Sequence, residues 1–413
     1  MTNLNLPPAP ADVHECSVFK RLLETSTPRD GLSAKSERFV NIAGPLLDSV
    51  GRRAFGSYTL HNRDHAKKVL HLAGYLIPQN TLSELSALES AMLVFSSYLH
   101  DMGMALTEEK RMAVLGSDEF LALLETLPEV SRSLAECRKK LDSAEPIERI
   151  ALENKIFELE ELALTRFLRD RHAIPVRYRE LLATIDKVAG EDLFEVEGVP
   201  FRDYLVDVCA SHGNSATQLA EISGPYTEAF PRAEVIAGQK LNVQFCAAVL
   251  RIADAFDFDR ERRPRVLFQS LGISASALPG SGISLQEWER HQATHSVDVT
   301  DQEIVVMATC HHPVIEGALR AYCSSLETEV RETLAVLRQN REEIAKKYIL
   351  NVPPLVRAKV RSVGYIYKDL SFKLNQPAIM DLLMGGASLL SPRRRFARTS
   401  TERHRCLQCE AID

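Results

Sequence analysis

The stretch LSALESAMLVFSSYLHDMGM, residues 85–104, decides the fold of this chain. Its apolar side chains cover nearly every side of a helical projection, which is typical of a helix buried in a protein core. His100 and Asp101 lie at the end of this apolar run, and Gly103 marks the expected end of the helix. A buried imidazole or carboxylate without a partner costs several kcal/mol, and a metal ion is one partner that satisfies several such groups together.

Two other stretches also combine an apolar helical pattern with embedded polar groups. LHNRDHAKKVLHLAGYLI, residues 60–77, carries His61 and His65, which share a helix face because they lie four positions apart. NVQFCAAVLRIADAFDFD, residues 242–259, is apolar on most sides around Asp254. We therefore expect core helices at these places, and their polar side chains are candidate metal ligands.

The residues alone leave alternatives open for some candidates. His61 fits a surface or capping histidine as well as a site residue. Asp254 also fits a buried aspartate that pairs with Arg251 or Arg260. Arg260 and Arg263 are candidates for contact with a substrate phosphate, but they fit a charged helix end equally well.

Composition indicates a folded, water-soluble protein of ordinary type. The 413 residues are 45% hydrophobic and 26% charged, which disfavours disordered, fibrous and membrane proteins and suggests two or three globular units. The formal net charge of -6 disfavours nucleic acid as a non-specific partner. The first twenty residues lack a signal-peptide pattern and no apolar run is long enough to span a bilayer, so we expect a cytoplasmic protein whose eight cysteines are reduced.

The pattern along the chain predicts a mainly α protein with several segments. Apolar positions at helical spacing indicate further helices at about 201–222 and 235–258, and β-branched residues around a polar turn indicate a hairpin before Cys310. The expected segments are a loosely held arm (1–35), a helical domain (36–278) with an exposed, charge-rich helical insertion (107–171), a small β-hairpin (279–313), a long amphipathic helix (314–350), a further segment (351–390) and a basic, unstructured tail (391–413).

The order H…HD…D, carried by His65, His100–Asp101 and Asp254, resembles the HD superfamily of metal-dependent phosphohydrolases. HNRDHAKKV resembles the HNxxHxxxV opening of that family, SSYLHDMGM its apolar-HD-x-G element, and LRIADAFD its closing helix. The similarity covers about residues 36–265. It implies an HD-type helical bundle, to which the β-hairpin and the long C-terminal helix are attached.

The resemblance also implies roles for individual residues. It makes His65, His100, Asp101 and Asp254 the ligands of a first divalent ion, with Asp101 able to bridge to a second ion. His61 would be the proton donor to the leaving oxygen, and His172 and His212 are the available histidines for a second metal. His172 is an alternative proton donor or substrate-positioning group. The donor types suit Mn, Fe, Mg or Zn, with one or two ions in the site.

A closer resemblance is to the HD-CE arrangement, in which an HD domain is joined to a chaperone-like GHKL ATPase. The segment LQEWERH, the hairpin and the stretch YKDLSFKLNQPAIMDLLMG carry this resemblance. Residues 372–385 fit the helix that opens the ATPase, but the expected magnesium-binding helix and glycine-rich lid do not follow in this sequence. We therefore expect residues 351–390 to be a remnant of the ATPase opening segment, from truncation or from an altered reading frame after Met384.

Two functions follow from these observations. The first is a phosphohydrolase that uses metal-activated water to attack a small, nucleotide-like phosphomonoester or phosphodiester. The second is a non-catalytic HD module that senses a ligand and regulates a GHKL-type ATPase in a stress or conflict system. The charged insertion at 107–171 is a candidate surface for a protein partner under either function.

Overall fold

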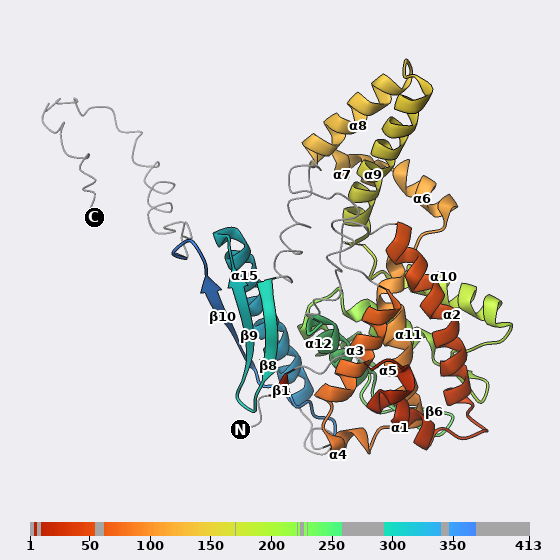
Figure 1. Cartoon of the computed structure of the whole chain (residues 1–413). Helices are drawn as coiled ribbons and strands as arrows, with labels where there is room; N and C mark the ends of the chain where they lie inside the picture. The colour runs from red at the N-terminus through yellow and green to blue at the C-terminus, as the bar shows by residue number, and fades with distance from the viewer. Residues whose placement is uncertain are drawn as a thin grey trace, which may run out of the picture. The chain divides into compact units, whose positions relative to one another are not determined.

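The fold is described from a computed structural model of the chain (Figure 1). The structure describes residues 4–5, 10–53, 62–169, 171–220, 222–223, 227–228, 230–257, 293–339 and 347–368. All of these except Lys368 belong to one compact unit, Met1–Tyr367. The fold is mainly α, as the sequence predicts.

The centre of the fold is helix α5 (Ala87–Leu99), in which every residue is buried. Ser86 and Glu89 form a capping box that fixes where α5 begins. The helices packed against α5 are α1 (Ser17–Thr25), α2 (Leu32–Arg53), α3 (Arg63–Leu76), α11 (Arg202–Ser211) and α12 (Val243–Ala255). Helix α10 (Pro175–Ala189) packs on α2 and α11, and the short helix α4 (Gln79–Leu82) follows α3.

Helix α1 differs from the loosely held arm that the sequence suggested for residues 1–35. It buries Val18, Phe19 and Leu22 completely, and it packs on α3 and α5. Close approach to α3 depends on Gly74, since a Cβ there would lie 2.1 Å from Ser17 Oγ. A helix of nine residues shows its apolar face only two or three times, so its periodicity is weak in the sequence.

Two of the predicted helices are shorter than expected. The helix expected at 201–222 is α11 followed by the 3-10 helix η3 (Ala216–Ala220). The helix expected at 235–258 is α12, and before it lies a hairpin of β6 (Glu234–Ile236) and β7 (Gln239–Leu241). Ala237 and Gly238 have φ angles of 46° and 78°, which suit a two-residue turn between twisted strands. Two further small hairpins are β2 (Glu195–Val196) with β3 (Val199–Pro200), and β4 (Ile222–Ser223) with β5 (Thr227–Glu228).

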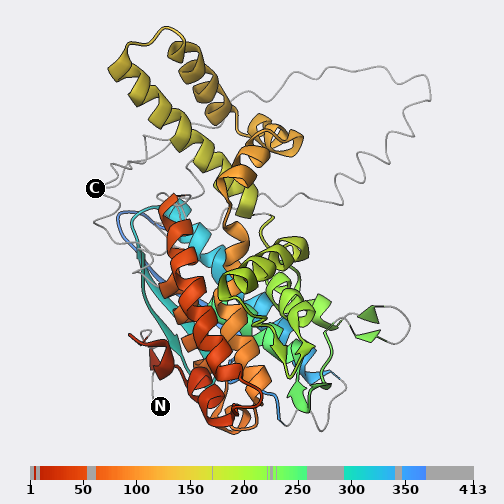
Figure 2. The same cartoon turned by 90° about the vertical axis from the view of Figure 1, so that its right-hand side faces the viewer.

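Residues 107–171 form an insertion with a small hydrophobic core of its own. The insertion consists of α6 (Glu108–Leu115), α7 (Asp118–Glu125), α8 (Pro128–Leu141) and α9 (Pro146–Arg169). Its core includes Phe120, Val130, Leu134 and Leu159, and it reaches Met104 beside the HD dipeptide. In Figures 1 and 2, α8 and α9 lie side by side and extend away from the helices around α5. The charged residues expected in this region therefore lie on the surface of helices that pack around a core of their own.

The β-hairpin is part of a larger sheet. Strands β8 (Thr294–Val299) and β9 (Glu303–Cys310) form the expected hairpin, and β1 (Leu4–Asn5) pairs with β8. Strand β10 (Leu355–Ser362) runs parallel to β9, and α15 (Pro313–Arg338) makes the crossover between them. The segment expected to be an ATPase remnant thus supplies a sheet strand, whose alternation of Val356, Ala358 and Val360 with basic residues indicates period two.

Several sequence predictions lie outside the described residues: His61, Arg260, Arg263, Asp170 within the insertion, the stretches 258–292 and 340–346, and the tail after Lys368. None of the six cysteines in the described part of the chain is in a disulfide. No helix within that part has the length and apolar character needed to cross a membrane.

Candidate metal centre

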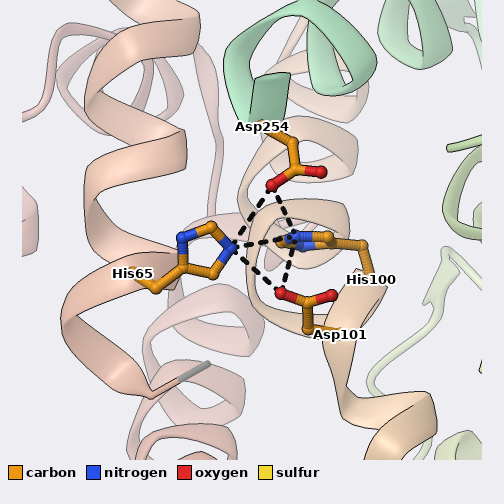
Figure 3. Close-up of side chains that lie close together, drawn as sticks. All are labelled: His65, His100, Asp101 and Asp254. Atoms are coloured by element: carbon orange, nitrogen blue, oxygen red, sulfur yellow. Dashed lines mark hydrogen bonds and ion pairs between the residues drawn. The ribbon is translucent and has the colours of Figure 1, made fainter. Parts of the chain in front are cut away.

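Four side chains from three separate parts of the fold meet in the core (Figure 3). His65 comes from the first turn of α3, His100 and Asp101 from the 3-10 helix η2 (His100–Met104), and Asp254 from the last turn of α12. One ligand atom of each lies within 4.8 Å of those of the other three. We call these four residues the first ligand set.

The distances within the first ligand set are short throughout. His65 Nε2 lies 3.0 Å from Asp101 Oδ2 and 3.4 Å from Asp254 Oδ1. His100 Nε2 lies 3.2 Å from Asp101 Oδ2 and 3.6 Å from Asp254 Oδ1. The two Nε2 atoms are 3.3 Å apart. The Asp254 side chain is 30% exposed, against 1% for the His65 side chain, so the set is open to solvent on the Asp254 side.

Local structure explains how His65 and the HD dipeptide reach this place. Asn62 caps α3 and accepts a hydrogen bond from the backbone of His65, which fixes the first turn. Helix α5 ends at Leu99, and the tighter η2 turn begins with His100 and Asp101. Tyr178 of α10 donates its hydroxyl proton to the His100 carbonyl at 2.5 Å and holds that turn in place.

A second group of side chains shares Asp101 with the first. His172 and His212 have Nε2 atoms 2.8 Å apart, and His172 Nε2 lies 3.7 Å from Asp101 Oδ1. Asp101, His172 and His212 together have the spacing of a possible metal site, and we call them the second ligand set. Because Asp101 turns Oδ2 toward the first set and Oδ1 toward the second, one carboxylate is placed between them.

Hydrogen bonds at Nδ1 fix the tautomers of the two histidines in the first set. His65 Nδ1 lies 2.6 Å from Oδ2 of the buried Asp257, and His100 Nδ1 lies 3.0 Å from the Ser97 carbonyl. A carbonyl or ionised carboxylate only accepts, so each Nδ1 carries the donated proton. In the neutral form of each ring, Nε2 then presents a lone pair toward the centre of the set. Such an arrangement is the usual one for histidines that bind metal.

The same arrangement recurs in the second ligand set. His172 Nδ1 donates to the Arg169 carbonyl at 2.7 Å, and His212 Nδ1 donates to the Cys209 carbonyl. Two Nε2 lone pairs at 2.8 Å repel each other unless a proton or a cation lies between them. Four imidazole nitrogens and two carboxylates thus converge, and this donor set fits a divalent cation such as Mn, Fe or Zn.

The electrostatics differ between the two ligand sets. Burial disfavours a charged imidazole, but the carboxylates of Asp101 and Asp254 outweigh it and raise the pKa of His100 well above its ordinary value. Burial opposes ionisation of Asp254, but hydrogen bonds from protonated Nε2 atoms of His100 and His65 hold its pKa well below the usual range. A divalent cation that binds the first ligand set would displace these Nε2 protons. Burial, with His100 and His172 nearby, lowers the pKa of His212 to about 4. His212 therefore stays neutral, as a cation ligand must.

Two glycines make room for the segment that carries His172. A Cβ at Gly103 would lie 2.2 Å from the His172 carbonyl oxygen, which real contacts never show. A Cβ at Gly213 would lie 2.6 Å from the Cβ of Ala173. Each glycine follows a predicted ligand closely, so the segment at 172–173 is seated between the two parts of the chain that carry Asp101 and His212.

The structure therefore brings together six side chains that the sequence singled out, namely His65, His100, Asp101, His172, His212 and Asp254. Asp254 does not pair with Arg251, the alternative left open above, because Arg251 donates to Glu329 instead. Asp257, the partner of His65 Nδ1, is a residue that sequence reasoning missed. Its spacing of three residues from Asp254 was the available signal.

Comparisons with known proteins give one match. The HD-CE family model matches residues 55–332, a span that contains both ligand sets. No curated protein and no solved structure matches the chain.

Proposed function

Because the chain belongs to the HD-CE family, with an HD-type domain over residues 55–332, we propose that it is a metal-dependent phosphohydrolase. The proposed substrate is a small, nucleotide-like phosphomonoester or phosphodiester. One observation carries the proposal: four histidines are held at Nδ1 by acceptors outside the cluster and turn their Nε2 atoms inward, two of them toward Asp101 and Asp254 and two toward Asp101. This is how a protein prepares a site for divalent cations.

In this proposal each ligand set would hold one divalent cation, and Asp101, whose two oxygens face different sets, would belong to both. A bound divalent ion supplies Lewis acidity, which activates water for attack on phosphorus and offsets charge on the phosphoryl oxygens. The Asp257 carboxylate keeps His65 in the tautomer that the first set requires. The partly exposed Asp254 marks the side from which a substrate phosphate would approach.

The proton donor to the leaving oxygen is proposed to be His61, four residues before His65. His172 was the other candidate. Its Nδ1 proton is donated to Arg169 and its Nε2 faces His212, so the geometry favours a ligand role for His172 over proton donation. General-acid catalysis typically contributes about a hundred- to ten-thousand-fold, so His61→Ala should lower kcat within that range.

The test is metal analysis of the purified chain, followed by a panel of nucleoside triphosphates, cyclic nucleotides and an aryl phosphate with added Mn²⁺. Asp101→Ala should lose both bound metal and turnover, because it removes an oxygen from each ligand set. The matched control is Asp203→Ala, since the Asp203 side chain is 76% exposed and pairs only with Arg179 at the surface of α11 among the described residues. An Asp101→Ala variant with full metal content and full turnover contradicts the proposal.

The second candidate function is a regulatory module with little turnover. The exposed apolar side chains of the insertion support this candidate. Ile147 and Ile150 on α9 are 86% and 60% exposed, and Phe157 on the same helix is 47% exposed. Large apolar side chains exposed together are common at protein-binding surfaces. We propose this part of the insertion as the contact with a protein partner. Metal binding without turnover on any phosphoester in the panel would select the regulatory function.

A further inference from the structure

A buried arginine outside both ligand sets connects the helix α15 with the metal centre. Arg251 lies on α12, and its side chain is 4% exposed. A buried guanidinium needs both a counter-charge and hydrogen-bond acceptors. Glu329 of α15 supplies the charge, because its two oxygens accept from Arg251 Nε at 2.8 Å and from Nη2 at 2.9 Å. The planar fork of arginine matches this two-oxygen contact.

The remaining nitrogen of the same guanidinium is used in a different part of the fold. Arg251 Nη1 donates to the carbonyl oxygen of Ser211, the last residue of α11. Ser211 is itself 1% exposed, and its carbonyl also accepts from the backbone N–H of Asn214 at 3.0 Å, so Arg251 is its side-chain donor. The Ser211 carbonyl belongs to the peptide group that joins Ser211 to His212. Arg251, together with the Asn214 N–H, thus holds the orientation of the backbone directly before His212.

The position of that backbone determines where the His212 imidazole points. His212 is held at its Nδ1 by the Cys209 carbonyl, so its Nε2 faces His172. The bonds that orient the histidines of the first ligand set come from elsewhere, from Asp257 and the Ser97 carbonyl. Arg251 is therefore connected to the second ligand set more directly than to the first.

We propose that Glu329 and Arg251 are positioning residues for the second ligand set. Glu329 on α15 holds the guanidinium, and the guanidinium holds the peptide before His212, so that a second divalent cation binds tightly only while α15 is docked on α12. The inference rests on the proposed metal-dependent function and assigns a control element to it. Partners of a metal ligand that lie outside the coordination sphere typically change metal affinity about 10- to 100-fold.

The experiment is a Mn²⁺ titration of the full chain by equilibrium dialysis, with electron paramagnetic resonance to separate a coupled pair of ions from an isolated one. Glu329→Gln keeps the shape of the side chain but removes the charge. Arg251→Lys keeps the charge but has no fork to reach Glu329 and Ser211 together. The control is Tyr322→Phe, which removes a 2.7 Å hydrogen bond from α15 to the Ala255 carbonyl of α12 without touching Ser211.

The unchanged chain should bind two Mn²⁺ ions and give the signal of a coupled pair. Glu329→Gln and Arg251→Lys should raise the dissociation constant of the second ion by about 10- to 100-fold while the first ion stays bound, and Tyr322→Phe should keep both. Equal loss in Tyr322→Phe, or tight binding of both ions in Glu329→Gln, overturns the inference. If the unchanged chain binds one ion, the inference about Arg251 and Glu329 is wrong but the proposed hydrolase function still stands. If the unchanged chain binds no ion, the inference and the proposed function are both wrong.

Discussion

The tautomer of His65 depends on a single neighbour, Asp257. That carboxylate is buried and lies 2.6 Å from His65 Nδ1. With the proton held at Nδ1, the lone pair at Nε2 is directed to Asp101 and Asp254. A histidine in the other tautomer would present an N–H group to the cation and could not bind it.

We therefore expect Asp257→Asn to lower the affinity of the first ligand set for a divalent cation by about 10- to 100-fold. The reason is that an amide lacks the charge that makes the imidazole a stronger ligand. Isothermal titration with Mn²⁺ measures the change. Asp64→Asn serves as the control on α3, since the Asp64 side chain is 75% exposed. Equal affinities for the Asp257→Asn variant and the unchanged chain would show that Asp257 does not tune the ligand.

At this scale the sequence was informative about the residues that carry metal chemistry. His65, His100, Asp101 and Asp254 could be selected because polar groups are rare inside apolar helices. Asp257 could not be selected in the same way. Asp257 reaches His65 only because the end of α12 packs against α3. A single sequence does not show that contact.

At the scale of elements, the η2 turn and the segment after α9 are packed without space between them. Gly103 allows this, because any side chain there would meet the backbone of His172. The contact joins the HD dipeptide to the end of the insertion. The position of His172 therefore depends on a residue that has no functional group.

Gly103→Ala should lower the free energy of unfolding by about 1–3 kcal/mol, since the backbone at His172 has to shift to accept the methyl group. Urea denaturation measures this effect. Gly116→Ala is the matched control, because a Cβ there lies 3.6 Å from its nearest neighbour, the Met112 carbonyl oxygen, and meets no clash. A loss of stability in Gly116→Ala as large as in Gly103→Ala would rule out the steric explanation.

The elements themselves were predictable to different degrees. Long apolar helices such as α5 and α12 follow from their periodicity, and the β8–β9 hairpin follows from its β-branched residues. Helix α1 and the β6–β7 hairpin were not recognised, since segments of nine and three residues contain too few repeats. Strand β10 needed knowledge of its partner β9, whose paired residues lie 52 positions earlier along the chain, as in Leu355 with Glu303.

At the scale of the whole molecule, Glu316 ties the crossover helix α15 to the end of β10. It is completely buried, and its oxygens accept hydrogen bonds from Ser362 and Tyr365 at 2.7 and 2.8 Å. Arg320, one turn further along α15, donates two more. Burial alone would raise the pKa of Glu316, but these donors outweigh it and lower the pKa.

Glu316→Gln should therefore lower the free energy of unfolding by about 1–3 kcal/mol at pH 7, a modest value because the Arg320 side chain is 40% exposed. A lowered pKa in the folded state means that this stability is present above the unfolded pKa of about 4.3 and is lost as the pH falls through the folded value. Denaturation at pH 7 and at about pH 3 measures the difference. If the difference in free energy of unfolding between the unchanged chain and Glu316→Gln is larger at about pH 3 than at pH 7, the lowered pKa of Glu316 is contradicted.

The course of α9 has a mechanical consequence. One uninterrupted helix of 24 residues begins beside the exposed Ile147 and ends at Arg169, whose carbonyl holds the His172 ring. At 1.5 Å per residue this is a rod about 36 Å long. A rigid helix transmits a displacement of its N-terminal end to its C-terminal end. A molecule bound at the N-terminal end of α9 would thus reorient the His172 imidazole without approaching the metal centre.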